Sequence, residues 1–381
     1  MEDWGPRSRL TLLLDHFGAM KDTREPWRVA YPLREVLFLA VCGSLADCDD
    51  YENIVAWGEA HLDFLRRFSP FHHGVPCADW MAALMNRIDG ALFSACFSAW
   101  VEQAWPDRPD LVAIDGKSVR RSHDHASGRR PLHLVSAFAT KRRLVLGQEA
   151  VEDKSNEITA IPALLERLDL KGALVSVDAM GCNPAVAEAI TGAGADYLLA
   201  VKGNQPTLHA EIAAYFDTAP EAELDTETTL DKSRGRIETR TCVVSRTTGW
   251  LNADRAYPRA PRFPGLAAIA RVEAVVEHRG KVTTERRYYI TSRPLDAKVC
   301  ADAVQSHWAI ENSLHWTLDV TFKEDASRIR TGSGPINMAV VRRFAFNLLR
   351  QVDDKTSIKT RRKLASWSTD YLLRVLQCPD R

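Results

Sequence analysis

The chain has 381 residues, of which 45% are hydrophobic and 26% are charged, which is ordinary for a folded globular protein and unlike a disordered chain. Its formal net charge is zero, but residues 1–110 carry 10 Lys and Arg against 17 Asp and Glu, whereas residues 111–381 carry 40 against 33. The length exceeds that of one ordinary domain, and the charge difference indicates that the second part is the one that could face DNA.

The cysteines and the apolar segments exclude several classes of protein. The eight cysteines are scattered without a Cys-x-x-Cys pair, so the sequence predicts neither a zinc site nor a small disulfide framework. The first thirty residues contain no apolar signal-peptide core, and no stretch approaches the roughly 18 to 20 apolar residues of a membrane span. We therefore expect a cytoplasmic protein without membrane contact.

The first part of the chain has apolar residues at helical spacing. Residues 32–57 show this pattern, broken by a polar turn at 47–50, and it returns at 78–85 and 93–101. Pro106 and Pro109 then end the pattern. We predict a helical N-terminal domain over residues 1–108 and a second domain over residues 109–381.

The second part begins with short apolar runs that are typical of strands. The predicted order is three strands, then a helix, a strand, a helix and a strand, at 111–114, 132–138, 144–151, 157–168, 173–177, 184–190 and 197–201. This order predicts a mixed α/β sheet in which strands pair in parallel only where a helix lies between them.

The next segment differs in composition. Residues 206–285 are polar and charged, with alternating runs such as 241–245 and 268–276, and we predict a β-rich insertion there. After this insertion and a further strand-like run at 286–291, residues 301–322 and 336–352 show long helical periodicity.

Two aspartates directly follow apolar strand segments. Asp115 follows residues 112–114 and precedes Gly116, which would let a ligand approach the backbone, and Asp178 ends the strand at 174–177. Ligands bind at strand ends in α/β sheets, and two neighbouring carboxylates repel each other unless a cation lies between them. Either aspartate could instead be a helix cap or a turn former.

Glu311 is the best candidate for a third acid. It lies beside an apolar helical stripe formed by Ile310, Leu314 and Leu318, and three carboxylates suit a hard cation such as Mg²⁺ or Mn²⁺. Two alternatives remain at this stage. Glu311 could pair with His307 or His315, each one turn away, or the three residues could form a transition-metal face, although no His-Glu-x-x-His motif is present.

Basic residues are clustered in the second part of the chain. Five such groups lie at 120–121, 129–130, 141–143, 342–343 and 361–363. Groups of this kind are usually solvated, but five in one positive segment could form a surface that contacts phosphates. No Walker or Gly-x-Ser-x-Gly sequence supports nucleotide hydrolysis or acyl transfer.

Many ordered motifs resemble those of the H-repeat-associated, or ISAs-type, family of bacterial DDE insertion-sequence transposases. The resemblance covers nearly the whole chain, at 32–37, 54–58, 113–117, 133–138, 154–158, 178–181, 202–205, 235–238, 288–290, 307–316, 318–320, 324–325 and 347–349. It implies a ribonuclease H-like core with a β-rich insertion and a family-associated N-terminal domain. It also implies that Asp115 and Asp178 lie on strands and Glu311 on a following helix.

The resemblance and the residues together lead to one functional expectation. The acids Asp115, Asp178 and Glu311 would hold Mg²⁺ or Mn²⁺, and two such ions would promote cleavage of DNA by water and joining by a 3′-hydroxyl. Lys117, Lys202 and Arg236 are the candidate phosphate contacts. We expect the partners to be the DNA of element ends and targets, bound by a homo-oligomer at the nucleoid.

Two rival functions remain compatible with the sequence. A metal-dependent nuclease would keep the three acids but would cut DNA without joining it. A decayed or domesticated element would only bind DNA and would have no activity.

Overall fold

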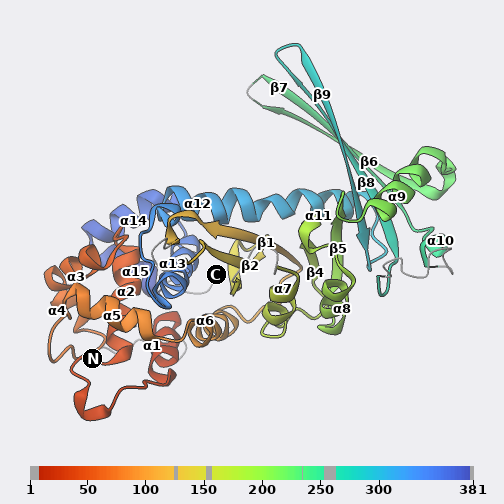
Figure 1. The fold of residues 1–381 in the computed structure, drawn as a ribbon. Coiled ribbons are helices and arrows are strands. Elements are labelled where there is room, and N and C mark those ends of the chain that lie inside the picture. The colour runs from red at the N-terminus through yellow and green to blue at the C-terminus, as the bar shows by residue number, and fades with distance from the viewer. Residues whose placement is uncertain (1–7, 124–127, 152–156, 234, 253–262, 378–381) are drawn as a thin grey trace.

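The computed structural model describes residues 8–123, 128–151, 157–233, 235–252 and 263–377, so residues 154–156 of the motif at 154–158 lie outside the described residues (Figure 1). Its strands are β1 (Leu111–Val119), β2 (Leu132–Ala139), β3 (Leu144–Val151), β4 (Leu174–Val177), β5 (Asp196–Val201), β6 (Leu224–Ser233), β7 (Arg236–Ser245), β8 (Ala268–His278) and β9 (Lys281–Thr291). Within these residues they form one mixed sheet in the order β3-β2-β1-β4-β5-β9-β8-β7-β6.

Helices precede, cover and follow this sheet. They are α1 (Arg9–Ala19), α2 (Leu33–Leu45), α3 (Tyr51–Ala60), α4 (Leu62–Leu65), α5 (Ala78–Arg87), α6 (Gly90–Ala104), α7 (Glu157–Leu165), α8 (Pro184–Gly192), α9 (Pro206–Thr218), α10 (Gly249–Asn252), α11 (Ala297–Ala309), α12 (Trp316–Val320), α13 (Gly334–Arg350), α14 (Ile358–Trp367) and α15 (Thr369–Gln377). Among the described helices, none combines the length and apolar composition needed to cross a membrane.

Strands β1 to β5 follow the predicted pattern of pairing. β1 pairs with β2, and β2 with β3, in antiparallel fashion, whereas β1 pairs with β4, and β4 with β5, in parallel. Helices α7 and α8 precede β4 and β5, so the prediction that parallel pairs require a helical connection is confirmed for these strands. Val112 and Ile114 of β1 lie in the core under α7 and α8, and Ala113 faces the opposite side, toward α13.

Strands β6 to β9 form a long ribbon that stands out from the rest of the molecule (Figure 1). The insertion is β-rich as predicted, but it begins with α9, which its polar composition concealed. Leu208, Ile212 and Phe216 form the buried stripe of this helix at a spacing of four residues. Strand β6 was also missed, because its Thr, Asp and Glu residues are mostly exposed and give no apolar alternation.

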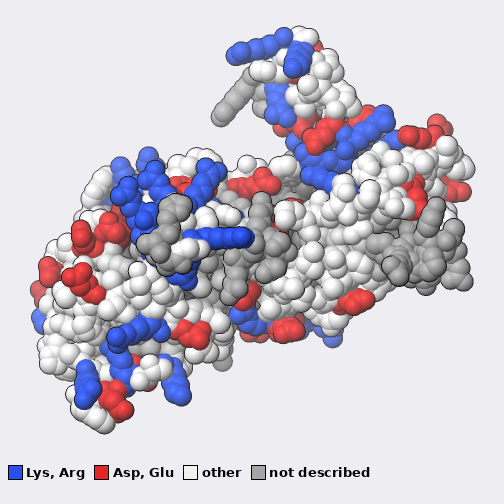
Figure 2. Space-filling view, in the orientation of Figure 1, with Lys and Arg blue, Asp and Glu red and all other residues white. Residues whose placement is uncertain are grey.

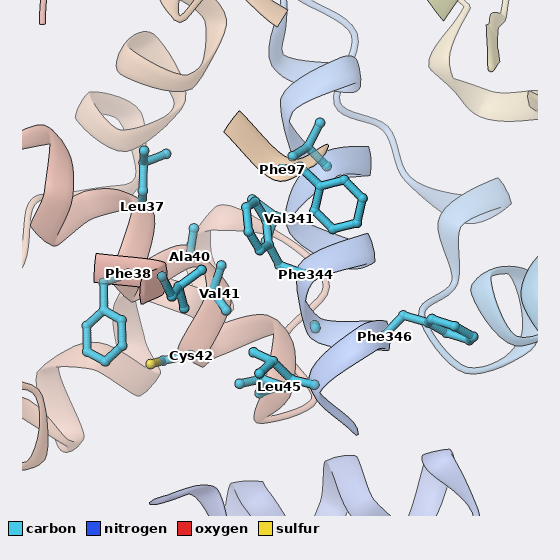
Figure 3. Packing of buried hydrophobic residues seen from close by; sticks show 14 of the residues in the cluster. Leu37, Phe38, Ala40, Val41, Cys42, Leu45, Phe97, Val341, Phe344 and Phe346 are labelled. Atoms are coloured by element: carbon cyan, nitrogen blue, oxygen red, sulfur yellow. The ribbon is translucent and has the colours of Figure 1, made fainter. Parts of the chain in front are cut away.

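The N-terminal helices share a hydrophobic core with the C-terminal helices. The ring of Phe344 on α13 lies 5.3 Å from that of Phe17 on α1 and 4.9 Å from that of Phe97 on α6, measured between centroids. Figure 3 shows Val41 of α2 pointing toward Val341 and Phe344 of α13. The predicted division after residue 108 therefore separates two parts of the chain that are packed together.

Replacing Phe344 tests this shared core. Its side chain is fully buried, so Phe344→Ala should lower the free energy of unfolding by about 3 to 5 kcal/mol, as measured by urea denaturation. As a control, Trp367→Ala removes a side chain that is 73% exposed and should change stability by no more than about 0.5 kcal/mol. Retention of wild-type stability by Phe344→Ala would contradict a shared core.

Candidate active site

Asp115 and Asp178 occupy equivalent positions on two parallel strands. The register of β1 and β4 ends with Ile114 opposite Val177, so each aspartate is the next residue after this last pair. Because side chains alternate between the faces of a strand, Asp115 lies on the same face as Ala113. Asp115 does not end its strand as expected, because β1 continues beyond it along β2.

Asp178 also caps a short helical turn. Its carboxylate accepts hydrogen bonds from the backbone N–H groups of Met180 at 3.0 Å and Gly181 at 3.3 Å. The capping role that the sequence left open is therefore present, and it fixes the orientation of the carboxylate. The capping role and a ligand role are compatible. Oδ1 accepts both hydrogen bonds, whereas Oδ2 accepts neither of them.

Glu311 lies on a π-helical turn, Ile310–His315, which joins α11 to α12. Ile310, Leu314 and Leu318 are fully buried, as the predicted apolar stripe requires, and Glu311 itself is exposed. π-Helical turns are frequent at functional sites. Asp178 and Glu311 both line a pocket of about 120 Å³.

The three acids influence one another electrostatically. Burial raises the pKa of Asp115 to about 7, and the negative charges of Asp178 and Glu311 contribute to this rise. Burial also raises the pKa of Asp178 and that of Glu311, whereas Lys202 opposes both of these increases. The site thus holds like charges that a bound cation would stabilise.

The donor chemistry of this site fits a hard divalent ion. Carboxylate oxygens are the preferred ligands of Mg²⁺, and Asp115 sits where its own ionisation is disfavoured without a cation. In the described part of the chain, no three His, Cys, Asp or Glu side chains are already gathered closely enough to hold a metal ion.

Lys117 points into the protein and not toward a DNA surface. Its ammonium lies 2.7 Å from Asp319, 3.1 Å from Asp325 and 3.3 Å from Glu324, and its side chain is only 7% exposed. Burial by itself would lower the pKa of Lys117, but these carboxylates raise it above its ordinary value. The structure thus gives Lys117 a structural role, so we do not carry its expected phosphate contact forward.

Lys202 and Arg236 lie in different places. Lys202 follows β5, is exposed, and lines the pocket that contains Asp178 and Glu311. Arg236 begins β7 in the ribbon, where it forms an ion pair with Glu238 at 2.7 Å. It lines a separate groove of about 680 Å³ that lies between the ribbon and α11.

Three residues around the site were not predicted from the sequence. Arg287 on β9 lines the acid pocket, lowers the pKa of Glu311 against the effect of burial, and stacks 4.6 Å from the ring centre of Trp308. Glu157 and His133 fill the space beside Gly116, so our interpretation that this glycine admits a ligand is wrong. The sequence showed the strand-like run that contains Arg287 and the motif that contains Glu157. It did not show that these residues lie close to the acids in space.

Neither histidine near Glu311 pairs with it. His307 Nδ1 lies 2.9 Å from Ser176 Oγ, and His315 Nδ1 lies 3.4 Å from Asp115 Oδ2. Burial lowers the pKa of His307 to about 4 and that of His315 to about 3, so both rings are neutral near pH 7. The alternative transition-metal face is therefore not formed among these residues.

Two of the five basic groups are largely buried, although Lys363 in the group at 361–363 is exposed. Arg343 is fully buried, with its guanidinium 2.6 Å from Glu324. Arg362 is fully buried against Asp47 and Asp49, each at 3.1 Å. The prediction that these groups form a DNA surface is wrong at these positions, because sequence alone does not show whether an arginine has an internal acidic partner.

Comparison with known proteins shows which family this chain matches. Residues 106–348 match the Transposase DDE domain, and residues 14–101 match the domain associated with it, described as DDE_Tnp_1-associated. A provisionally named transposase of Escherichia coli O157:H7, YncI, is 38% identical over 371 residues, covering 96% of this chain and 94% of the relative. A provisionally named H repeat-associated transposase of Escherichia coli K12, YhhI, is 36% identical over 376 residues, covering 96% and 98%.

One solved structure gives a much weaker match. The piggyBac transposase synaptic complex with hairpin DNA aligns with a TM-score of 0.43 and 9% identity, covering 98% of this chain and 83% of that chain. A similarity this weak indicates neither a shared fold nor a shared function.

Lys117→Met tests the structural role of this lysine. Removing this buried cation takes one partner from each of three carboxylates, of which Glu324 keeps Arg343 and Asp325 keeps Arg120, so the free energy of unfolding should fall by about 3 to 5 kcal/mol. Lys323→Met, which removes a lysine that is 63% exposed and paired with Asp49, should cost about 1 kcal/mol or less. Unchanged stability of Lys117→Met with weakened DNA binding would instead indicate a phosphate contact.

Asp115→Asn tests the electrostatic state of the acid site. Folding raises the pKa of Asp115 from 3.8 to about 7, so its ionised form destabilises the fold increasingly as the pH rises through this range. In metal-free buffer at pH 8, Asp115→Asn should therefore be more stable than the wild type, on the order of 2 to 4 kcal/mol. The difference should shrink toward pH 4, and a difference independent of pH would contradict the assignment.

Proposed function

This chain belongs to the DDE transposase family. We propose that it is an enzyme that cleaves and rejoins DNA, with Asp115, Asp178 and Glu311 as the acids of its active site and divalent metal ions as cofactors. One observation carries the proposal. Two aspartates follow directly on the last paired residues of neighbouring parallel strands, and their charges and that of Glu311 act on one another.

The sheet supports a ribonuclease H-like core as part of this proposal. Strands β1 to β3 are antiparallel neighbours, β4 and β5 extend the sheet in parallel, and the β-rich insertion separates β5 from the helix that carries Glu311. We also propose the division into residues 1–108 and 109–381, because one family match ends at residue 101 and the other begins at residue 106, close to this boundary.

The residues of the chain have separate tasks in the proposed reaction. Asp115 and Asp178 would supply oxygen ligands, and Asp115 would give up its proton in the presence of a cation. When bound, divalent metal ions would supply activation of the attacking oxygen and stabilisation of the leaving oxygen. Lys202 and Arg287 line the pocket and would orient the phosphate that is cut. Water would hydrolyse a P–O3′ bond and release a 3′-hydroxyl. This hydroxyl would then attack a second phosphodiester, forming a new P–O3′ bond and displacing the 3′-oxygen of the attacked strand as a hydroxyl.

DNA would lie across the acid pocket and the groove beneath the ribbon. Arg287 and Trp308 line both cavities, so the two adjoin each other. Arg236 and Arg240 line the groove, and Figure 2 shows Lys and Arg side chains gathered over the base of the ribbon. A second basic patch lies over the region of α12 and α14 (Figure 2). Two such surfaces suit a homo-oligomer that holds element ends and a target.

Asp115→Asn should separate DNA binding from chemistry. With Mg²⁺ as the only metal, cleavage of element-end DNA should be abolished, because the variant lacks a charged ligand. The dissociation constant in a gel-shift assay should stay within about threefold of wild type, because affinity comes mainly from cations that neutralise phosphates.

The matched control is Asp110→Asn, which changes an exposed aspartate immediately before β1 that is paired with Lys141. This variant should cleave at the wild-type rate. Cleavage by Asp115→Asn at that rate would overturn the proposed site. A strand-transfer assay on precut ends completes the test, since cutting without joining would identify a nuclease.

A further inference from the structure

A buried pair of titratable side chains lies beside the acid site and has no part in the mechanism above. Glu157 is the first residue of α7, and its Oε1 lies 2.5 Å from Nε2 of His133 on β2. The other ring nitrogen of His133 lies 2.8 Å from the hydroxyl of Ser118, its cross-strand neighbour on β1. Glu157 is 6% exposed and His133 is 2% exposed, so this chain of contacts is shielded from solvent.

Glycines bring α7 close to the backbone that follows each aspartate. A Cβ atom at Gly116 would lie 2.3 Å from Oε1 of Glu157 and 2.7 Å from Nε2 of His133, so no larger residue fits while the pair is in place. A Cβ atom at Gly181 would lie 3.1 Å from Ile161, one turn further along α7. The same helix therefore packs against the segment after Asp115 and the segment after Asp178.

The position of Glu157 also places a fourth negative charge near the acids. Its charge is one of the causes that raise the pKa of both Asp115 and Asp178, in addition to burial. The N-terminus of a helix stabilises a carboxylate electrostatically, and Glu157 lies in the first turn of α7. A charge held in this way attracts a cation at the site without having to bind it.

We infer that Glu157, held by His133, is a positioning residue that raises the affinity of the acid site for a divalent cation. It does so by fixing the backbone at Gly116, next to Asp115, and by adding a fixed negative charge. This inference rests on the proposed metal-dependent function. It concerns a residue outside the three acids, so the two can fail separately.

The test is a titration with Mn²⁺, in which free Mn²⁺ is measured by electron paramagnetic resonance. Glu157→Gln keeps the size of the side chain and a hydrogen-bond acceptor but removes the charge, and it should weaken Mn²⁺ binding by about 10- to 100-fold. Asp115→Asn should bind no measurable Mn²⁺ at the site. Glu166→Gln, which removes an exposed charge just after α7, should stay within about twofold of wild type.

The metal dependence of DNA cleavage provides a second measurement. In Glu157→Gln, saturating Mn²⁺ should restore the wild-type maximal rate, because only metal affinity is reduced, whereas a folding defect would lower the rate at every Mn²⁺ concentration. Gly116→Ala, which displaces Glu157 without removing a charge, should also weaken Mn²⁺ binding, and it serves as the test if Glu157→Gln does not fold.

The outcomes separate the two proposals. Wild-type affinity in both Glu157→Gln and Gly116→Ala would overturn the positioning role. Complete loss of binding in Glu157→Gln, as in Asp115→Asn, would overturn it in favour of direct ligation. Absence of Mn²⁺ binding by the wild-type protein would overturn the proposed metal-dependent function itself.

Discussion

The arrangement of the acid site depends on the buried ammonium of Lys117. This single cation on β1 contacts Asp319 on α12 and both Glu324 and Asp325 in the turn that follows. Burying a charge is costly unless it is paired, so the burial of Lys117 requires these carboxylates. The contacts join the strand that carries Asp115 to α12, which directly follows the π-helical turn that carries Glu311.

The same cluster extends into the helical core. Arg343 on α13 is fully buried and holds Glu324 from the other side. Although burial alone would raise the pKa of Glu324, Arg343 and Lys117 lower it to about 2, so its carboxylate stays charged. Helix α13 also carries Phe344, which packs on the N-terminal helices. The N-terminal part of the chain thus supports the acid site through α13, without contributing any of the three acids.

The two groups of acids in this region differ in whether cations neutralise them. The Lys117 cluster neutralises its acids internally, whereas Asp178 and Glu311 line a pocket together with Lys202 and Arg287, and Asp115 is influenced by the charges of both acids. The first arrangement is complete by itself. The second arrangement is not, because burial and the charge of a neighbouring carboxylate raise the pKa of each acid, and for Asp178 that carboxylate is Glu157. An incomplete arrangement of this kind is stabilised by a cation, and this is why we interpret it as the reactive site.

Local periodicity and connection type in the sequence predicted strands β1 to β5, parallel pairing only across a helix, and the apolar stripe beside Glu311. They did not reveal α9, whose apolar stripe lies among polar residues, or β6, which has no apolar alternation. Which charges are internal became clear only from the three-dimensional packing. Lys117, Arg343 and Arg362 look like surface cations in the sequence, and Gly116 looks like an open approach to a ligand. The partners that bury them, such as Glu324 and Glu157, are distant along the chain, and burial depends on those partners and not on neighbouring residues.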